Sequence, residues 1–163
     1  MSKSKAIILI LILCTLVSLV GCAQTQKNYV STKTSLELQA IQKREFETTY
    51  KTAFAATLSI FQDKGFIINT ADATTGLVTA ASNKDSKFIP FVGQAIEYTK
   101  STAFIELVSS GKVAIRLNFV KHQETSNGYG MAGGNSVPIE DPVFYQKIFE
   151  DIQKGIFVRS NLN

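Results

Sequence analysis

The segment Val113–Lys121 alternates between apolar and polar side chains, and this alternation constrains the fold more than any other feature of the chain. Successive side chains of a β-strand point to opposite faces, so one face should pack on a core while the other lies nearer water. The preceding two-residue Ser110–Gly111 loop predicts a hairpin with a strand over Ser101–Ser109, because glycine supplies the positive φ that such turns require. The residues expected to face the core are Val113, Ile115, Leu117 and Phe119.

Two segments carry apolar residues at the three-and-four spacing of one helical face. The first follows a cap at Thr48 or Thr49 and ends at Gly65, because glycine commonly occupies the position just after a helix. The second begins at Asp141-Pro142, an N-cap followed by proline at the first helical position. The stripes expected to be buried are Tyr50, Ala53, Phe54, Thr57, Leu58 and Phe61 in the first helix, and Tyr145, Ile148, Phe149, Ile152 and Ile156 in the second.

A short strand around residues 44–46 and a hairpin joining residues 66–70 to residues 77–81 complete the predicted elements. Their order predicts an α+β fold, a two-layer sandwich in which an antiparallel meander of about four to five strands carries two helices on one face. A single domain should span residues 41–158 and be followed by a C-terminal tail over residues 159–163. We expect residues 122–137 to form a polar, glycine-rich loop.

The N-terminus has the organisation of a signal peptide. Lys3 and Lys5 precede an apolar run of about 15 residues, which is short for a membrane span. The four residues Leu19-Val20-Gly21-Cys22 resemble the lipobox of bacterial lipoproteins at every position. This resemblance implies that residues 1–21 are removed, and that both the Cys22 thiol and the new amino terminus are acylated.

The residues after the lipobox bear on location and partners. Residues 22–40 are polar and lack apolar periodicity, so the sequence predicts a flexible tether behind the lipidated Cys22. Ala23 resembles the residue found in lipoproteins sent to the outer membrane, which implies an outer-membrane protein facing the periplasm in a cell with two membranes. Loss of Lys3 and Lys5 with the signal lowers the net charge from +4 to about +2. That low charge, without a Lys/Arg cluster, argues against nucleic-acid binding.

The domain itself resembles a group of small bacterial lipoproteins. The helix end Phe61–Phe66 reads "Q-D-x-G-F" in its last five positions, and the hairpin segment Gly76–Ala80 reads "G-L-V-T-A". The closing segment Asp141–Phe149 is similar to the last helix of those proteins, and the likeness covers roughly residues 41–158. In its helix-plus-meander pattern and its anchoring, the chain is also similar to the repeat domains of the NlpB/BamC lipoproteins of the outer-membrane assembly machinery. Neither resemblance implies a catalytic residue.

The sequence offers little material for catalysis or metal binding, so we expect no cofactor, no metal and no enzymatic activity. His122 is the single histidine, and the two cysteines belong to the signal and the lipobox. A metal site or a nucleophilic triad needs several convergent groups. Each carboxylate has a structural explanation: Glu140-Asp141 surrounds a helix start, Glu150-Asp151 lies along a helix, and Glu106 should pair across strands with Arg116 or Lys112.

A glycine-rich segment over residues 128–133 matches G-x-G-x-x-G, but a dinucleotide site requires a helix directly after it. Gly134 and Pro138 follow instead, so we interpret the segment as a loop. Its apolar residues Tyr129 and Met131 are candidate contact residues.

The segment Phe88–Ile96 is apolar yet interrupted by Pro90 and Gly93, which argues against a regular strand. It should either fold back over one end of the core or expose an apolar surface to a partner, a lipid or the membrane. The residues that would form this surface are Phe88, Ile89, Phe91, Val92 and Ile96.

These features together predict a lipid-anchored, non-enzymatic lipoprotein of the cell envelope that acts as a protein-interaction or assembly module. The alternative is a protein that binds a small apolar ligand or lipid between its helices and its sheet. A cavity of roughly several hundred Å³ at that interface would favour the ligand, whereas a filled core with an exposed apolar patch would favour a protein partner.

Overall fold

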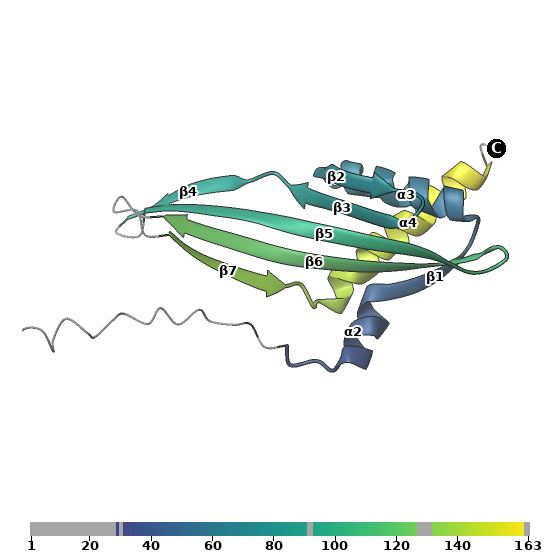
Figure 1. Cartoon of the computed structure of the whole chain (residues 1–163), viewed down its shortest axis with the longest axis horizontal. Helices are drawn as coiled ribbons and strands as arrows, with labels where there is room; N and C mark the ends of the chain where they lie inside the picture. The colour runs from purple at the N-terminus through teal and green to yellow at the C-terminus, as the bar shows by residue number, and fades with distance from the viewer. Residues whose placement is uncertain (1–28, 30, 91–92, 127–131, 162–163) are drawn as a thin grey trace, which may run out of the picture.

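The computed structural model describes residue 29 and residues 31–90, 93–126 and 132–161, and within them the chain forms three helices and seven strands (Figure 1). In chain order these elements are α2 (Ser35–Gln42), β1 (Lys43–Glu47), α3 (Tyr50–Asp63), β2 (Phe66–Asp72), β3 (Leu77–Ser82), β4 (Asp85–Ile89), β5 (Gly93–Ser109), β6 (Lys112–Ser126), β7 (Ala132–Pro138) and α4 (Pro142–Asn161).

All seven strands belong to one antiparallel sheet. Five of them follow the order β1-β6-β5-β3-β2, and off this path β4 pairs with β5 and β7 pairs with β6. The two central strands are long enough to take a second partner each. Strand β5 pairs with β3 over residues 100–104 and with β4 over residues 93–97. Strand β6 pairs with β1 over residues 112–116 and with β7 over residues 120–126. The α+β class and the antiparallel sheet are confirmed, but the strand count exceeds the predicted four to five.

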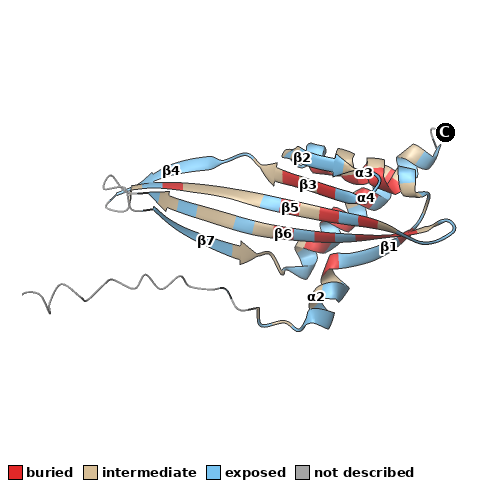
Figure 2. Ribbon diagram, in the orientation of Figure 1, coloured by how far each residue is buried: buried red, intermediate tan, exposed pale blue. Residues whose placement is uncertain are grey.

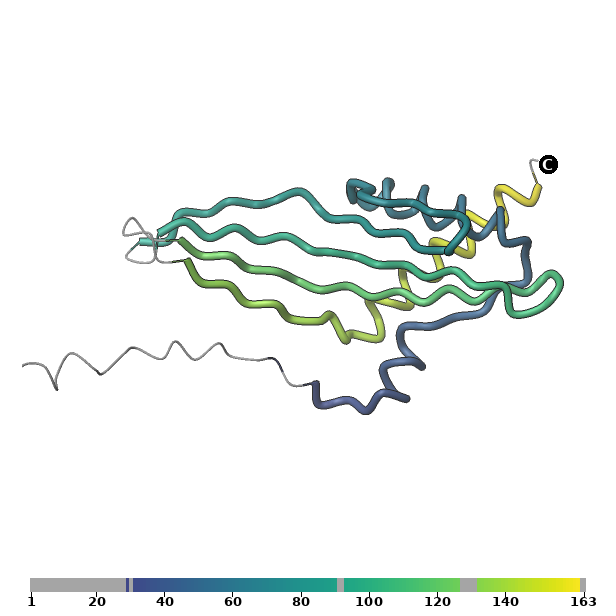
Figure 3. Tube along the Cα trace, in the orientation of Figure 1, coloured from purple at the N-terminus to yellow at the C-terminus, as the bar shows by residue number. Residues whose placement is uncertain are grey.

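These pairings divide the sheet into two parts. We call the first the covered half: strands β1, β2 and β3 with residues 99–109 of β5 and 112–119 of β6. The second is the extension: strands β4 and β7 with residues 93–98 of β5 and 120–126 of β6. Helices α3 and α4 lie against the covered half, whereas the extension runs on beyond both helices, as Figures 1 and 3 show. Buried residues accordingly gather in the covered half (Figure 2).

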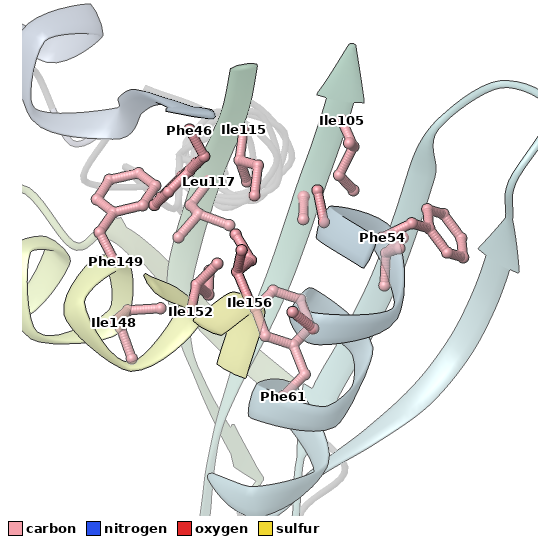
Figure 4. Close-up of a cluster of buried hydrophobic side chains, with 14 of the residues drawn as sticks. Phe46, Phe54, Phe61, Ile105, Ile115, Leu117, Ile148, Phe149, Ile152 and Ile156 are labelled. Carbon is pink, nitrogen blue, oxygen red and sulfur yellow. The ribbon is translucent and has the colours of Figure 1, made fainter. Parts of the chain in front are cut away.

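The core fills the space between the two helices and the covered half (Figure 4). Phe119 lies at its centre, with ring centroids 5.9 Å from Phe61, 5.0 Å from Phe144 and 5.7 Å from Tyr145. The four strand residues predicted to face the core are buried, as are all five predicted residues of α4. In α3 the predicted stripe is buried at Ala53, Phe54, Thr57 and Phe61 and partly buried at Tyr50 and Leu58.

Local sequence signals explain where the elements begin and end. The Thr49 side chain caps α3 by accepting a hydrogen bond from the Thr52 amide at 3.2 Å. Gly76 lies at φ +77, and its carbonyl oxygen accepts a hydrogen bond from the Ile105 amide at 2.9 Å. An added Cβ there would lie 2.0 Å from the Ile105 carbonyl oxygen, so only glycine fits at this turn.

Three segments differ from the sequence-based expectation. Residues 35–40, expected within the tether, belong to α2, which the reciprocal Thr34–Glu37 capping box begins. The expected loop over residues 122–137 is largely strand, because β6 continues to Ser126 and β7 begins at Ala132. Helix α4 continues into the expected tail as far as Asn161. In each of these segments the backbone is regular but the sequence has no apolar periodicity, so periodicity could not predict the helix or strand.

Candidate interaction surface

The outer face of the extension, which we define as the face directed away from α3 and α4, gathers the candidate residues. Phe119 faces the helices, so strand alternation directs Val120, His122 and Glu124 of β6 to the outer face. Directly paired residues of antiparallel strands share a face, which adds Ile96 and Tyr98 of β5. By the same rule Ser86 and Phe88 of β4, and Ser136 of β7, complete the outer face.

The apolar segment predicted as a candidate surface forms a hairpin. Phe88 and Ile89 end β4 and pair with Gln94 and Gly93 at the start of β5, so the expectation that this segment is not a regular strand is wrong. The reason is that Pro90 follows the last paired residue of β4, and Gly93 begins β5 at φ +105. Pro90 therefore lies just after β4 and Gly93 at the first position of β5, so neither interrupts the interior of the ladder.

Exposure separates the candidate residues. Phe88 is 77% exposed and Ile89 is 38% exposed, whereas Ile96 is half-buried opposite Glu124. Phe91, Val92, Tyr129 and Met131 lie outside the described residues, as does Cys22. The structure thus brings Phe88 and Ile96 onto one face and leaves the phenylalanine side chain in water.

Tyr98 is the centre of a polar and aromatic cluster on the outer face. Its ring stacks on His122 with centroids 5.0 Å apart and planes 12° apart, and its hydroxyl donates to Glu124 Oε1 at 2.8 Å. The Nζ atoms of Lys84 and Lys100 lie 5.1 and 5.7 Å from the centroid of the Tyr98 ring, within cation–π range. We call these five residues the Tyr98 cluster.

The environment of the Tyr98 cluster shifts two pKa values. Burial lowers the pKa of His122, and the nearby Lys100 charge lowers it further. The hydrogen bond to Glu124 raises the pKa of Tyr98, with burial as a second cause. His122 was expected at the start of the loop over residues 122–137. It lies instead within β6, half-buried, with Nδ1 2.9 Å from Ser136 Oγ.

Three of the carboxylates considered in the sequence make contacts that stabilise the fold. Asp141 Oδ1 accepts from the Val143 amide at 2.9 Å at the start of α4, and Asp151 pairs with Lys64 at 2.5 Å. Glu106 pairs with Lys43 on β1 at 2.7 Å, so the expected pairing with Arg116 or Lys112 is wrong. The small Ala114 lies opposite Glu106 on β6, and we attribute the different partner to it: its side chain leaves room for a contact that reaches over β6 to β1. Across the described ranges, no three His, Cys, Asp or Glu side chains are grouped to hold a metal ion.

The surface of the described chain carries, among others, two grooves that lie outside the interface between the helices and the sheet. A groove of about 560 Å³ follows the seam of α3 and α4, with Ile60, Gly155 and Val158 as its apolar lining and Lys64 and Asp151 at its rim. A smaller one of about 210 Å³ lies along the covered half near Gln42. The interface named by the ligand alternative is occupied by core side chains.

No protein-family model matches this chain, and no curated protein matches it closely enough in sequence to count as a relative. Within the part of the chain that the structure describes, no helix is both long enough and apolar enough to cross a membrane. The candidate surface is therefore interpreted from its own geometry.

Proposed function

We propose that this protein is a lipid-anchored, non-enzymatic lipoprotein of the cell envelope that acts as a protein-interaction or assembly module through the outer face of its extension. In a cell with two membranes it is held at the outer membrane and faces the periplasm. The observation that carries the proposal is Phe88, 77% exposed on the extension, the part of the sheet against which no helix of the described chain lies.

The chemistry around Phe88 supports a protein partner. Burying a phenylalanine side chain contributes about 1.5–3 kcal/mol relative to leaving it in water, so an exposed one is available to drive association. The same face carries the Tyr98 cluster, and aromatic rings beside polar groups are typical of interface centres. The filled core supports a partner over the alternative of a small apolar ligand or lipid between helices and sheet.

The anchor rests on the lipobox. A single acyl chain holds a protein to a membrane reversibly, whereas two or more hold it stably, at about 0.8 kcal/mol for each buried CH₂ group. Burial is the largest cause that raises the pKa of Tyr29, and the nearby Glu140 raises it further.

The interaction role is tested by Phe88→Asp in the full-length protein, with Phe157→Asp as the matched control. Phe157 is 66% exposed near the C-terminal end of α4, which lies at the opposite end of the molecule from the extension (Figure 1). Both variants should melt like the wild type, because neither side chain is in the core. Crosslinking in intact envelopes followed by mass spectrometry should show a partner protein for the wild type and for Phe157→Asp, and its loss for Phe88→Asp. An unchanged partner profile in Phe88→Asp contradicts the proposal.

The anchor is tested separately by Cys22→Ser. Intact-mass measurement should show the diacylglyceryl adduct on the wild type and its absence in the variant, which should also leave the membrane fraction while its domain stays folded. An unmodified Cys22 in the wild-type protein contradicts the anchor.

A further inference from the structure

Four strands of the sheet have one neighbour each among the described residues, and they differ in how their free edges are protected. Natural proteins blunt such edges with charged side chains or irregular register, because an open ladder pairs readily with another chain. Strand β1 carries four charged residues, β4 carries Asp85 and Lys87, and β2 ends in Asp72 and has a register shift after Ile68. Strand β7 has neither device: it is uncharged and pairs with β6 without a shift, and its one edge-protecting residue is Pro138 at its end.

The hydrogen-bonding groups that β7 leaves unpaired can be identified from its ladder. The Ile139 amide donates to the Phe119 carbonyl oxygen at 2.8 Å, so residues 119 and 139 form a hydrogen-bonded pair. Antiparallel pairs alternate between bonded and non-bonded, which turns residues 133, 135 and 137 toward β6 and residues 132, 134, 136 and 138 toward the free edge. Pro138 has no amide hydrogen and presents only its carbonyl group.

We propose that the free edge of β7 binds β7 of a second copy of this protein, antiparallel, with Asn135 of each copy on the two-fold axis. In this register Gly134 lies opposite Ser136 of the partner, and Ala132 lies opposite Pro138. The outward groups then make about six hydrogen bonds between the copies, and the extension becomes a continuous sheet across both.

The composition of β7 favours its own copy as the occupant. A two-fold axis places each residue opposite a member of the same strand, so any charge on β7 would face a like charge nearby. Strand β7 has none, and its small residues Gly133 and Gly134 let a second backbone approach. Strand β4, the other free edge of the extension, carries Asp85 and Lys87, and charged side chains are a usual protection of an exposed edge.

The seam is built from backbone groups and small side chains, so association in dilute solution should be weak. Anchoring on one membrane raises the effective concentration of the copies and so increases the fraction that is paired. This concentration effect rests on the proposed lipid anchor, whereas the register does not. The contact also leaves the outer face around Phe88 open, so a dimer and a partner protein can bind together.

The test is disulfide crosslinking of Asn135→Cys in the full-length protein in native membranes. In the proposed register the two Asn135 residues form a non-hydrogen-bonded pair with Cα atoms about 4.5 Å apart, within the range a disulfide spans. Lys87→Cys is the matched control, exposed on the other free edge of the same extension. Under mild oxidation the Asn135→Cys dimer should exceed the Lys87→Cys dimer at least about 10-fold.

Two further measurements complete the test. Gly134→Pro removes an outward amide hydrogen without touching the ladder to β6, so in the Asn135→Cys background it should lower crosslinking about 10-fold while the melting temperature stays near that of its parent. Crosslinking of Asn135→Cys no greater than that of Lys87→Cys overturns the proposal. A mixed Asn135→Cys and Lys87→Cys sample that crosslinks between the two variants overturns the two-fold register. Self-crosslinking is scored independently of the partner captured at Phe88, so the two proposals fail separately.

Discussion

Strands β5 and β6 pass through both parts of the sheet, so the covered half and the extension can be compared within one piece of backbone. In the covered half the helix-facing residues of β6 run from Val113 to Phe119 and are buried. The same series of positions continues in the extension with Lys121, Gln123 and Thr125, none of which is buried. The ladder persists from one part to the other while the apolar side chains stop at the boundary.

The comparison teaches that the two parts are held by different interactions. The covered half is stabilised by apolar burial against α3 and α4, at roughly 25 cal/mol for each Å² removed from water. The extension depends on backbone pairing and on cross-strand contacts such as the Tyr98–His122 stack, which contribute about 0.2–1 kcal/mol each. The extension should therefore be ordered by the covered half and add little to the global stability.

The largest expected effect is in the centre of the core. Phe61 is 1% exposed and contacts the rings of Phe66 and Phe119, so Phe61→Ala should lower the free energy of unfolding by about 3–5 kcal/mol. Phe88→Ala, the same change in the extension, should alter it by less than about 0.5 kcal/mol. Urea denaturation of both variants measures the contrast. Equal losses would show that the extension is as tightly packed as the core.

A pair of glycine substitutions sharpens the comparison at turn positions. Gly76 and Gly111 both lie at φ +77, but an added Cβ meets the Ile105 carbonyl at Gly76 and nothing within 4 Å at Gly111. Gly111→Ala should cost about 1–2 kcal/mol for the left-handed backbone alone. Gly76→Ala should cost about 3 kcal/mol, because the ladder to β5 must also shift. Similar melting temperatures for the two variants would contradict the steric assignment.

Hydrogen exchange tests the comparison within a single strand. Amides of β5 at residues 101–107 should exchange only when the domain unfolds, whereas those at residues 94–98 should exchange through opening of the extension. We expect the protection factors to differ at least 10-fold, or about 1.4 kcal/mol in opening free energy. Uniform protection along β5 would mean that the two parts unfold together.

The smallest expected effect is the pH dependence of the Tyr98 cluster. Burial and Lys100 lower the pKa of folded His122 below its unfolded value of about 6.5, so the unfolded chain takes up the proton first on acidification. The contribution of this group to stability is therefore complete above about pH 6.5 and is lost as the pH falls. Between about pH 7.5 and pH 5.5 the melting temperature of the wild type should fall more than that of His122→Gln. Parallel melting curves for the two proteins would contradict the assignment.

The covered half could be predicted from the sequence because each of its elements carries a periodic apolar signal. The stripe of α4 and the alternation of β6 identify their buried residues, and Gly65 and Asp141 locate helix boundaries. The extension gives no such signal, because no helix of the described chain lies against it and its strands need no apolar alternation. For that reason residues 122–137 resembled a loop.

The Tyr98 cluster could not be predicted from the sequence for another reason, which is the register of the β5–β6 pairing. Extrapolating the hairpin from the Ser110–Gly111 turn, where Ser109 pairs with Lys112, would place Tyr98 opposite Gln123. A register shift between Leu107 and Ser109 moves the pairing by one residue and brings His122 to Tyr98 instead. The charged residues of the edge strands are visible in the sequence. Which strands form the edges cannot be predicted from it, because that depends on β1 pairing with β6, a strand far from it in the chain.

The two-residue turn at Ser110–Gly111 also bears on the order of folding. It closes the β5–β6 ribbon, the longest pairing in the sheet, with one of the shortest possible loops, so these contacts lie close in sequence and cost little closure entropy. We expect the pairing of β5 with β6 to begin at the turn and to extend away from it. Residues beside β1 and β3 would then pair early, and those of the extension last. Gly111→Ala should accordingly slow refolding in stopped-flow experiments, whereas substitutions at Tyr98 should mainly speed unfolding. The extension, which we propose binds other proteins, is then also the last part of the molecule to fold.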